Sequence, residues 1–511
     1  MGALWRPLAG PQGSAPGWRA VCAGSSGPGR ARTESGHHLP SAGRQLERPS
    51  SRTPAWKSLL ALLCLVITGL LWLNGLLLSL EKPTVTGALD QRQLELRALA
   101  MPAAPPSLQP LLTGVDPLEE LRQSLLAQDD ADPGPGQGEP LLQLALLQQR
   151  QGQDIKASQL RDRLQEQIPS DQRALVTALE RGQRLERSQL DTLQQPWSLR
   201  PLTQRLLCEG LSQDPQGCGT STAAQQAVWR LVGVSWAPGL LLLLGVGLLL
   251  RQIWQQWRGQ APAAPRLEGP PLDLVDVTLL IAGGFVVLGE LTVPLLLSPA
   301  LGALLSPLNG EPALQQGLQV LLLYLGLMLA PLTILWVQMR GRASEHMGEG
   351  EPTAGLQWHW RPFGSSALQA LQVMLMLLPM VALVGWITDR IAGDQGGSNP
   401  LLELVLTTGQ PLALACFALT AVLLAPLFEE TLFRGVLLPV LGQRVGPGLA
   451  VLLSALIFAA AHLSLNELAP LMVLGLGLGW LRLRSGRLGS CVLVHALWNG
   501  FTFANLLLLA G

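Results

Sequence analysis

The chain has 511 residues, of which 48% are hydrophobic and 14% are charged. An ordinary soluble domain carries about 25% charged residues, so this composition predicts a membrane protein. The 35 basic and 35 acidic residues cancel, and no basic cluster is interleaved with aromatic residues, which argues against nucleic-acid binding.

The N-terminal part of the chain consists of a polar tail followed by a first apolar run. Residues 1–56 are rich in Gly, Pro, Ser and Arg and lack apolar periodicity, so we expect a disordered tail there. The abundant arginines and scarce acids also resemble an organelle transit peptide, although a plain cytoplasmic tail fits better. Residues 57–80 follow as a transmembrane anchor.

Residues 81–228 have a different composition, dominated by Gln, Leu, Arg and Glu. Apolar residues recur there at the three-to-four spacing of amphipathic helices, at Leu118, Leu121, Leu125, Leu160, Leu164 and Ile168. We expect a small extramembrane helical domain, serving either as a module for contact with a protein partner or as a spacer. Cys208 and Cys218 in this segment could form a disulfide in an oxidising compartment, but their spacing does not decide the pairing.

Nine apolar runs are candidates for helices that cross a bilayer core about 30 Å thick. They cover residues 58–80, 231–250, 277–297, 318–337, 368–387, 412–441, 449–463, 468–481 and 489–509. The runs at 449–463 and 468–481 are short. The predicted fold class is therefore an all-α polytopic membrane bundle of eight or nine spanning helices, with residues 229–364 as its N-terminal part, and an additional extramembrane helical domain.

Lysine and arginine gather in alternate short loops, which favours a cytoplasmic location for those loops. Basic residues precede the first run and follow the second, fourth, sixth and eighth, whereas the loops at 298–316 and 464–467 contain none. This alternation predicts a multi-pass protein with a cytoplasmic N-terminus and an outward C-terminus. The three cysteines inside predicted spans, Cys64, Cys416 and Cys491, are expected to be small buried residues.

Three charges interrupt the sixth run, in the stretch "APLFEETLFRG". An ionisable side chain in the centre of a spanning helix costs about 2.5–3.5 kcal/mol, so Glu429, Glu430 and Arg434 should face the bundle interior. Glu430 and Arg434 are four residues apart and can form an ion pair, while Glu429 is turned about 100° away and stays free to hold a water. Pro426 should kink or restart the helix, and together these features predict a polar cavity.

Two histidines lie in the last apolar runs. His462 is four residues after Phe458, and Asn499 is four residues after His495, so each pair shares a helix face. A single buried His or Asn usually makes a hydrogen bond between helices, but their combination with the charged trio indicates a common polar site. Glu290, also within an apolar run, has no accompanying motif, and we interpret it as interfacial.

These residues resemble three motifs of the CPBP intramembrane proteases, which include the CAAX prenyl endopeptidases of the Rce type and the bacterial Abi proteins. The patterns E-E-x-x-x-R, F-x-x-x-H and H-x-x-x-N are met in order and on separate helices by Glu429, Glu430, Arg434, Phe458, His462, His495 and Asn499. The resemblance covers about residues 365–511 and does not extend to residues 1–230.

The resemblance implies hydrolysis of peptide bonds in membrane-associated substrates. Glu429 and His462 would activate a water, His495 and Asn499 would stabilise the oxyanion, and the remaining motif residues, Glu430, Arg434 and Phe458, would orient them. The favoured mechanism needs no cofactor, although Glu429, His462 and His495 could instead hold Zn²⁺ in a metalloprotease.

The substrate remains open between processing of CAAX type and processing of leader or bacteriocin peptides. An alternative is a non-catalytic membrane scaffold or immunity-type protein with the same fold. A transporter would also place charges beside a broken helix, but no internal repeat of the C-terminal half is found in the sequence.

Overall fold

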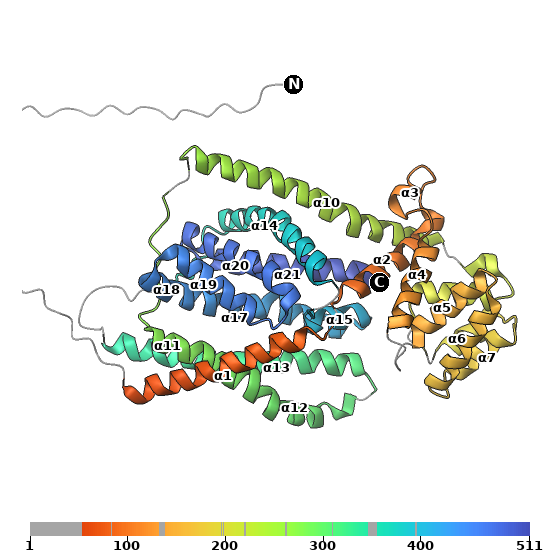
Figure 1. The fold of residues 1–511 in the computed structure, drawn as a ribbon, viewed down its shortest axis with the longest axis horizontal. Helices are drawn as coiled ribbons and strands as arrows, with labels where there is room; N and C mark the ends of the chain where they lie inside the picture. The colour runs from red at the N-terminus through yellow and green to blue at the C-terminus, as the bar shows by residue number, and fades with distance from the viewer. Residues whose placement is uncertain are drawn as a thin grey trace, which may run out of the picture. The chain divides into compact units, whose positions relative to one another are not determined.

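The computed structural model describes residues 54–82, 84–131, 138–195, 197, 199–218, 221–260, 263–308, 310–345, 355–393 and 396–510. Throughout these ranges the regular secondary structure is helical, and they contain no β-strand, which confirms the predicted all-α class (Figure 1). The tail expected over residues 1–56 lies, apart from its last three residues, outside the described ranges.

The segment after the first span folds into short helices around a leucine-rich core (Figure 1). The leucines predicted by helical periodicity belong to this core: Leu121, Leu125, Leu160 and Leu164 are buried, and Leu118 packs against them. The helices are α2 (Thr86–Ala100), α3 (Gln109–Leu112), α4 (Pro117–Ala131), α5 (Gly138–Arg150), α6 (Asp154–Gln167), α7 (Arg173–Glu180), α8 (Arg187–Gln194) and α9 (Pro201–Leu211).

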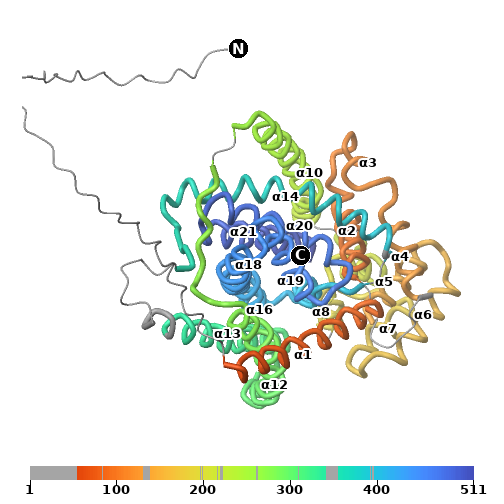
Figure 2. Tube along the Cα trace, turned by 60° about the vertical axis from the view of Figure 1, so that its left-hand side comes forward, coloured from red at the N-terminus to blue at the C-terminus, as the bar shows by residue number. Residues whose placement is uncertain are grey.

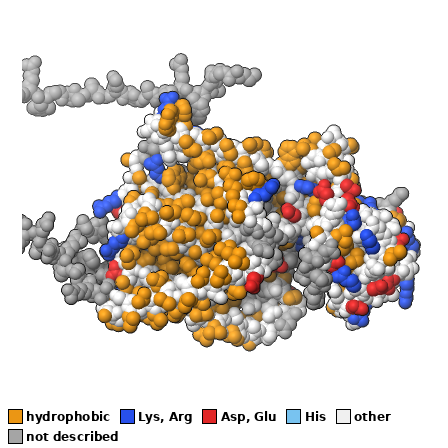
Figure 3. Space-filling model, in the orientation of Figure 1, with side chains coloured by type: hydrophobic (Ala, Val, Ile, Leu, Met, Phe, Trp, Pro, Cys, Tyr) orange, Lys and Arg blue, Asp and Glu red, His pale blue; other side chains and the backbone are white. Residues whose placement is uncertain are grey.

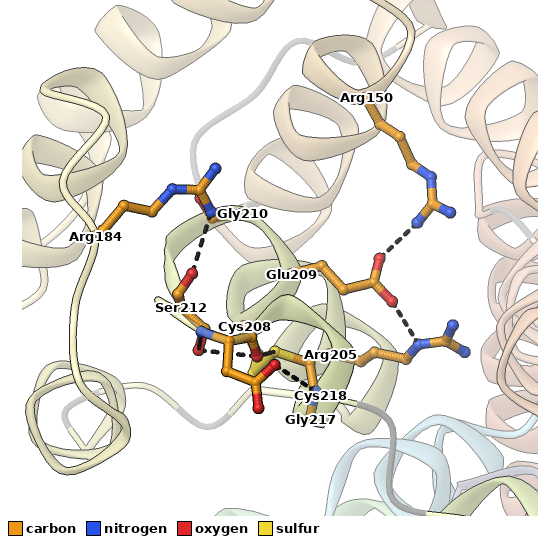
Figure 4. The surroundings of a disulfide bond; sticks show 10 residues. Arg150, Arg184, Arg205, Cys208, Glu209, Gly210, Ser212, Gly217 and Cys218 are labelled. Atoms are coloured by element: carbon orange, nitrogen blue, oxygen red, sulfur yellow. Dashed lines mark hydrogen bonds and ion pairs between the residues drawn. A yellow bond between two sulfur atoms is a disulfide. The ribbon is translucent and has the colours of Figure 1, made fainter.

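Cys208 and Cys218 form a disulfide that joins α9 to the short helix η2 (Pro215–Cys218), as Figure 4 shows. Nearby, the Glu209 carboxylate accepts hydrogen bonds from Arg150 at 2.6 Å and from Arg205 at 2.8 Å. The three cysteines predicted to lie within spans are free and buried.

Long apolar helices make up the rest of the structure (Figures 1 and 2). Seven stretches among the described residues are long and apolar enough to cross a membrane, and the protein is an integral, multi-pass membrane protein. They are α1 (Ala55–Ser79), α10 (Ser221–Trp257), the segment Leu274–Leu304, α13 (Pro312–Glu345), α14 (Phe363–Ala392), the segment Pro411–Val445 and α21 (Leu488–Ala510). Figure 3 shows a broad apolar surface over these helices and scattered charges over the α4–α7 region.

The two short predicted spans correspond to α19 (Pro447–Ala460) and α20 (Leu465–Ser485). With 14 residues, α19 is only about 21 Å long and is too short to cross the bilayer core alone. The two helices pack closely, because Gly475 and Gly479 of α20 lie against Ala455 and Val451 of α19. Between α14 and the site-bearing segment Pro411–Val445 lies the short helix α15 (Pro400–Thr407).

The helical segment 86–211 contacts the membrane helices through Arg92 of α2, which donates a hydrogen bond to the Leu406 carbonyl oxygen of α15 at 3.1 Å. Arg230 of α10 donates hydrogen bonds to the Leu508 and Leu509 carbonyl oxygens at 2.9 and 3.3 Å, at the C-terminal end of α21. A cation is favourable there because the last carbonyls of a helix carry partial negative charge. In α2, burial raises the pKa of Glu95, although Arg200 lies 2.7 Å away and acts in the opposite direction.

Candidate active site

The helix from Pro411 to Val445 changes its winding twice around the charged residues. It begins as α16 (Pro411–Ala418), continues as the π-helical segment η5 (Leu419–Leu424), and resumes as α17 (Ala425–Glu430), with Pro426 in its first turn. A second π segment, η6 (Thr431–Leu437), leads into α18 (Leu438–Val445). The helix runs continuously through Pro426, and its winding changes from π to α just before this proline, near the irregularity that the sequence predicted. π-Helical turns are rare in proteins, but those that occur often lie at functional sites.

Glu430 and Arg434 form the ion pair that their spacing predicts. Arg434 Nη1 donates to Glu430 Oε1 at 2.8 Å, and both side chains are fully buried. Arg434 also donates to the Gly475 carbonyl oxygen at 3.2 Å, and its guanidinium carbon lies 4.4 Å from the centroid of the Phe458 ring. This arginine consequently links the charged helix to α19 and α20.

His495 of α21 lies between the two glutamates. Its Nδ1 is 2.9 Å from Glu430 Oε1, and its Nε2 is 3.9 Å from Glu429 Oε2. The sequence predicted Arg434 as the partner of Glu430, and the structure adds His495 as a second partner. Since a carboxylate oxygen only accepts hydrogen bonds, Nδ1 of His495 carries the proton toward Glu430.

Glu429 is the more accessible of the two glutamates, with 17% of its side chain exposed. Its Oε1 accepts a hydrogen bond from the Tyr324 hydroxyl at 3.3 Å. Its Oε2 is buried and makes no hydrogen bond with the described residues. Glu429 thus presents one free acceptor oxygen toward His495, while the cavity expected around it stays a prediction.

Phe458 separates the two histidines. Its ring centroid is 5.0 Å from that of His462 and 5.7 Å from that of His495, both in edge-on geometry. His462 Nδ1 lies 2.9 Å from the Phe458 carbonyl oxygen. A carbonyl oxygen can only accept, so Nδ1 carries the proton and Nε2 of His462 is left as an acceptor. No direct contact joins His462 to either glutamate among the described contacts.

Asn499 lies one turn after His495 on α21. Its Nδ2 donates to the Ala421 carbonyl oxygen in η5 at 2.8 Å. An amide nitrogen has two hydrogens, so this bond fixes the side chain and leaves one donor.

The described residues contain no group of three or more His, Cys, Asp or Glu side chains arranged to hold a metal ion. The zinc set considered from the sequence, Glu429, His462 and His495, does not converge as such a group. We therefore derive the chemistry of the site from the protein groups alone.

Three residues near the site, Tyr324, Glu290 and Trp72, make contacts that the sequence did not predict. Tyr324, the one tyrosine of the chain, lies in the aliphatic run of α13 and contacts Glu429. Glu290, in the π-helical segment η3 (Leu279–Thr292), accepts a hydrogen bond from Trp72 Nε1 at 3.2 Å. The sequence suggested no partner for Glu290, and the structure supplies Trp72 of α1, while its place at the membrane interface stays a prediction.

A polytopic helical bundle here buries carboxylates and histidines around a carboxylate oxygen, Glu429 Oε2, that has no hydrogen bond among the described residues. Residues 411–501 match the family described as type II CAAX prenyl endopeptidase Rce1-like. All the motif residues lie within this match, and the chain carries a domain of this family, consistent with a CPBP family protease.

Other comparisons cover less of the chain or carry no functional description. Residues 86–229 match a domain of unknown function, DUF8675. An "Uncharacterized 24.3 kDa protein" of Escherichia coli is 45% identical over 82 residues, which are 15% of this chain and 38% of that protein. No solved structure matches the chain.

Proposed function

We propose that the protein is an intramembrane endopeptidase that hydrolyses peptide bonds of membrane-associated substrates with a water activated by Glu429. The observation that carries this proposal is the free Glu429 Oε2, buried and 3.9 Å from His495 Nε2. That distance is too long for a direct hydrogen bond and suits a water placed between the two atoms. The Rce1-like domain supports the same class of enzyme.

In the proposed reaction, Glu429 Oε2 takes one proton from the water while the water oxygen bonds to the scissile carbonyl carbon. General base catalysis of this kind contributes about 10²–10⁴-fold. The negative charge that develops on the carbonyl oxygen is stabilised by the remaining amide hydrogen of Asn499 and by His495 Nε2. His495 donates from Nε2 only in the doubly protonated ring, because its Nδ1 hydrogen is directed to Glu430. Glu429 then returns its proton to the leaving nitrogen as the carbon–nitrogen bond breaks.

His462 completes the site in this proposal. Its free acceptor nitrogen can hold the second hydrogen of the water, and Phe458 keeps its ring close to that of His495. The orienting role in this proposal belongs to Glu430, Arg434 and Phe458. Their side chains are fully buried, so they orient the reacting groups without touching the substrate.

The substrate we propose is a membrane-anchored peptide or protein, processed in the manner of CAAX motifs or of leader and bacteriocin peptides. We also propose that residues 365–511 form the catalytic core, that the N-terminus is cytoplasmic, and that residues 81–228 lie outside, where they can bind a protein partner.

Comparison of membrane-protein termini in cells that carry either the wild-type chain or Glu429→Ala tests this function. We expect at least one N- or C-terminus to depend on Glu429 and to remain in the control Glu403→Ala, an exposed carboxylate on α15. An identical set of termini in wild type and Glu429→Ala would contradict the protease and favour the non-catalytic scaffold of the same fold.

A further inference from the structure

The second oxygen of Glu429 is held by a helix outside the family match. Tyr324 belongs to α13, whereas the match covers residues 411–501. Its hydroxyl donates to Glu429 Oε1 at 3.3 Å, and its ring packs edge-on against Phe428, with centroids 6.2 Å apart. Phe428, the residue before Glu429, thus packs against the Tyr324 ring, whose hydroxyl contacts Glu429.

The two oxygens of a carboxylate are rigidly connected, so a hydrogen bond to one restricts the direction of the other. With Oε1 bound to Tyr324, Oε2 is the oxygen left toward His495. Without the tyrosine hydroxyl, rotation about the last side-chain bond is broad and would scatter both oxygens. A catalytic group must be held within about 0.5 Å of its productive geometry to act efficiently.

We propose that Tyr324 is a positioning residue of this site, whose hydroxyl fixes Glu429 so that Oε2 faces His495. This inference rests on the proposed function, because it assigns Glu429 the role of base. Tyr324 touches the base and not the reacting atoms, so it acts through Glu429.

The surroundings of Tyr324 are suited to such a role. Its neighbour η3 packs along α13, and Phe285 of η3 lies edge-on against Phe428 with ring centroids 5.8 Å apart. Glu290 of the same segment accepts a hydrogen bond from Trp72 Nε1 of α1 at 3.2 Å. The helices α1, η3 and α13 therefore supply one wall of the site, which the matched segment does not contain.

Kinetics of Tyr324→Phe provide the first test, with the full-length protein in vesicles and a peptide spanning the Glu429-dependent cleavage site found in cells. A hydrogen bond to a charged group corresponds to about a 10- to 100-fold effect, so kcat should fall by this factor with KM unchanged.

Thr333→Val is the matched control for this variant. It removes a hydroxyl from the same helix, where Thr333 is exposed and bonds only the Leu329 carbonyl oxygen at 2.7 Å. We expect wild-type kcat and KM for this control. If Tyr324→Phe also keeps the wild-type kcat, the positioning role is wrong, while loss of cleavage in Glu429→Ala would leave the proposed function standing.

A second measurement requires no substrate. The chain has one tyrosine, so incorporation of 3-fluorotyrosine gives a single fluorine-19 resonance from Tyr324. Glu429→Gln should shift this resonance, and Glu403→Gln should leave it in place. An unshifted resonance in Glu429→Gln would overturn the inference even where Glu429 proves essential for cleavage. A shifted resonance supports the contact independently of any protease activity.

Discussion

Glu430 shows how a charge is accommodated where there is no water. Its side chain is fully buried, and a single oxygen, Oε1, receives both Arg434 Nη1 and His495 Nδ1. A buried ion pair adds little net stability, because desolvation offsets the attraction between the charges. Loss of one partner is costly, however, since the other charge remains buried without compensation.

We expect Arg434→Ala to lower the free energy of unfolding by about 3–5 kcal/mol, because it leaves Glu430 buried beside a histidine alone. The yield of folded protein in detergent and its thermal unfolding midpoint should both decrease. Arg150→Ala is the control: its side chain is 51% exposed and bonds Glu209 at 2.6 Å, so the expected loss is about 0–1 kcal/mol. Equal midpoints for Arg434→Ala and wild type would contradict the structural role of the pair.

At the level of elements, the docking of α10 on α14 depends on a glycine and a proline. Pro379 of α14 has no N–H to bond the carbonyl oxygen of Leu375, four residues earlier. This carbonyl lies against Gly245 of α10, where an added Cβ would be 2.0 Å from the oxygen. Gly247, two residues further along α10, has open space at the corresponding position.

Gly245→Ala should therefore force α10 away from α14, whereas Gly247→Ala should be neutral or slightly stabilising, because alanine favours helix. Overpacking of this kind costs about 1–3 kcal/mol, and here the obstacle is backbone that cannot rotate away. Thermal unfolding of the two purified variants measures the difference. A midpoint for Gly245→Ala equal to that of Gly247→Ala would show that the helices are not in the close contact described.

The elements that the sequence predicted are those with a local signal. Apolar runs located the spanning helices, and the four-residue spacing placed Arg434 beside Glu430 and His495 one turn before Asn499. The contacts of Tyr324 with Glu429 and of Trp72 with Glu290 join residues more than 100 positions apart, and no periodicity encodes such pairs. The π-helical segments around Glu429 were likewise missed, since their composition is that of any apolar helix.

At the scale of the whole chain, α2 packs against the start of α10 and the end of α21, the helix that carries His495 and Asn499. Leu96 and Ala100 of α2 share an apolar cluster with Ala227, Leu231 and Leu509. Arg230 bonds the last carbonyls of α21, and Arg92 of α2 donates to the Leu406 carbonyl oxygen at 3.1 Å. The disulfide between Cys208 and Cys218 lies just before α10 in the chain. A disulfide persists in an oxidising compartment, and the outward location of this segment stays a prediction from the loop charges.

This topology predicts the reactivity of the cysteines in intact cells. After treatment with a membrane-impermeant reductant, an impermeant maleimide should label Cys208 and Cys218, because both lie in the segment predicted to face outward. Cys22 precedes the first span, on the predicted cytoplasmic side, and should react only after permeabilisation. Exchange of both disulfide cysteines for alanine should abolish outside labelling, since the remaining cysteines, Cys64, Cys416 and Cys491, are buried in the spanning helices. Labelling of Cys22 from outside would instead require the inverse orientation, with the segment 81–228 in the cytoplasm.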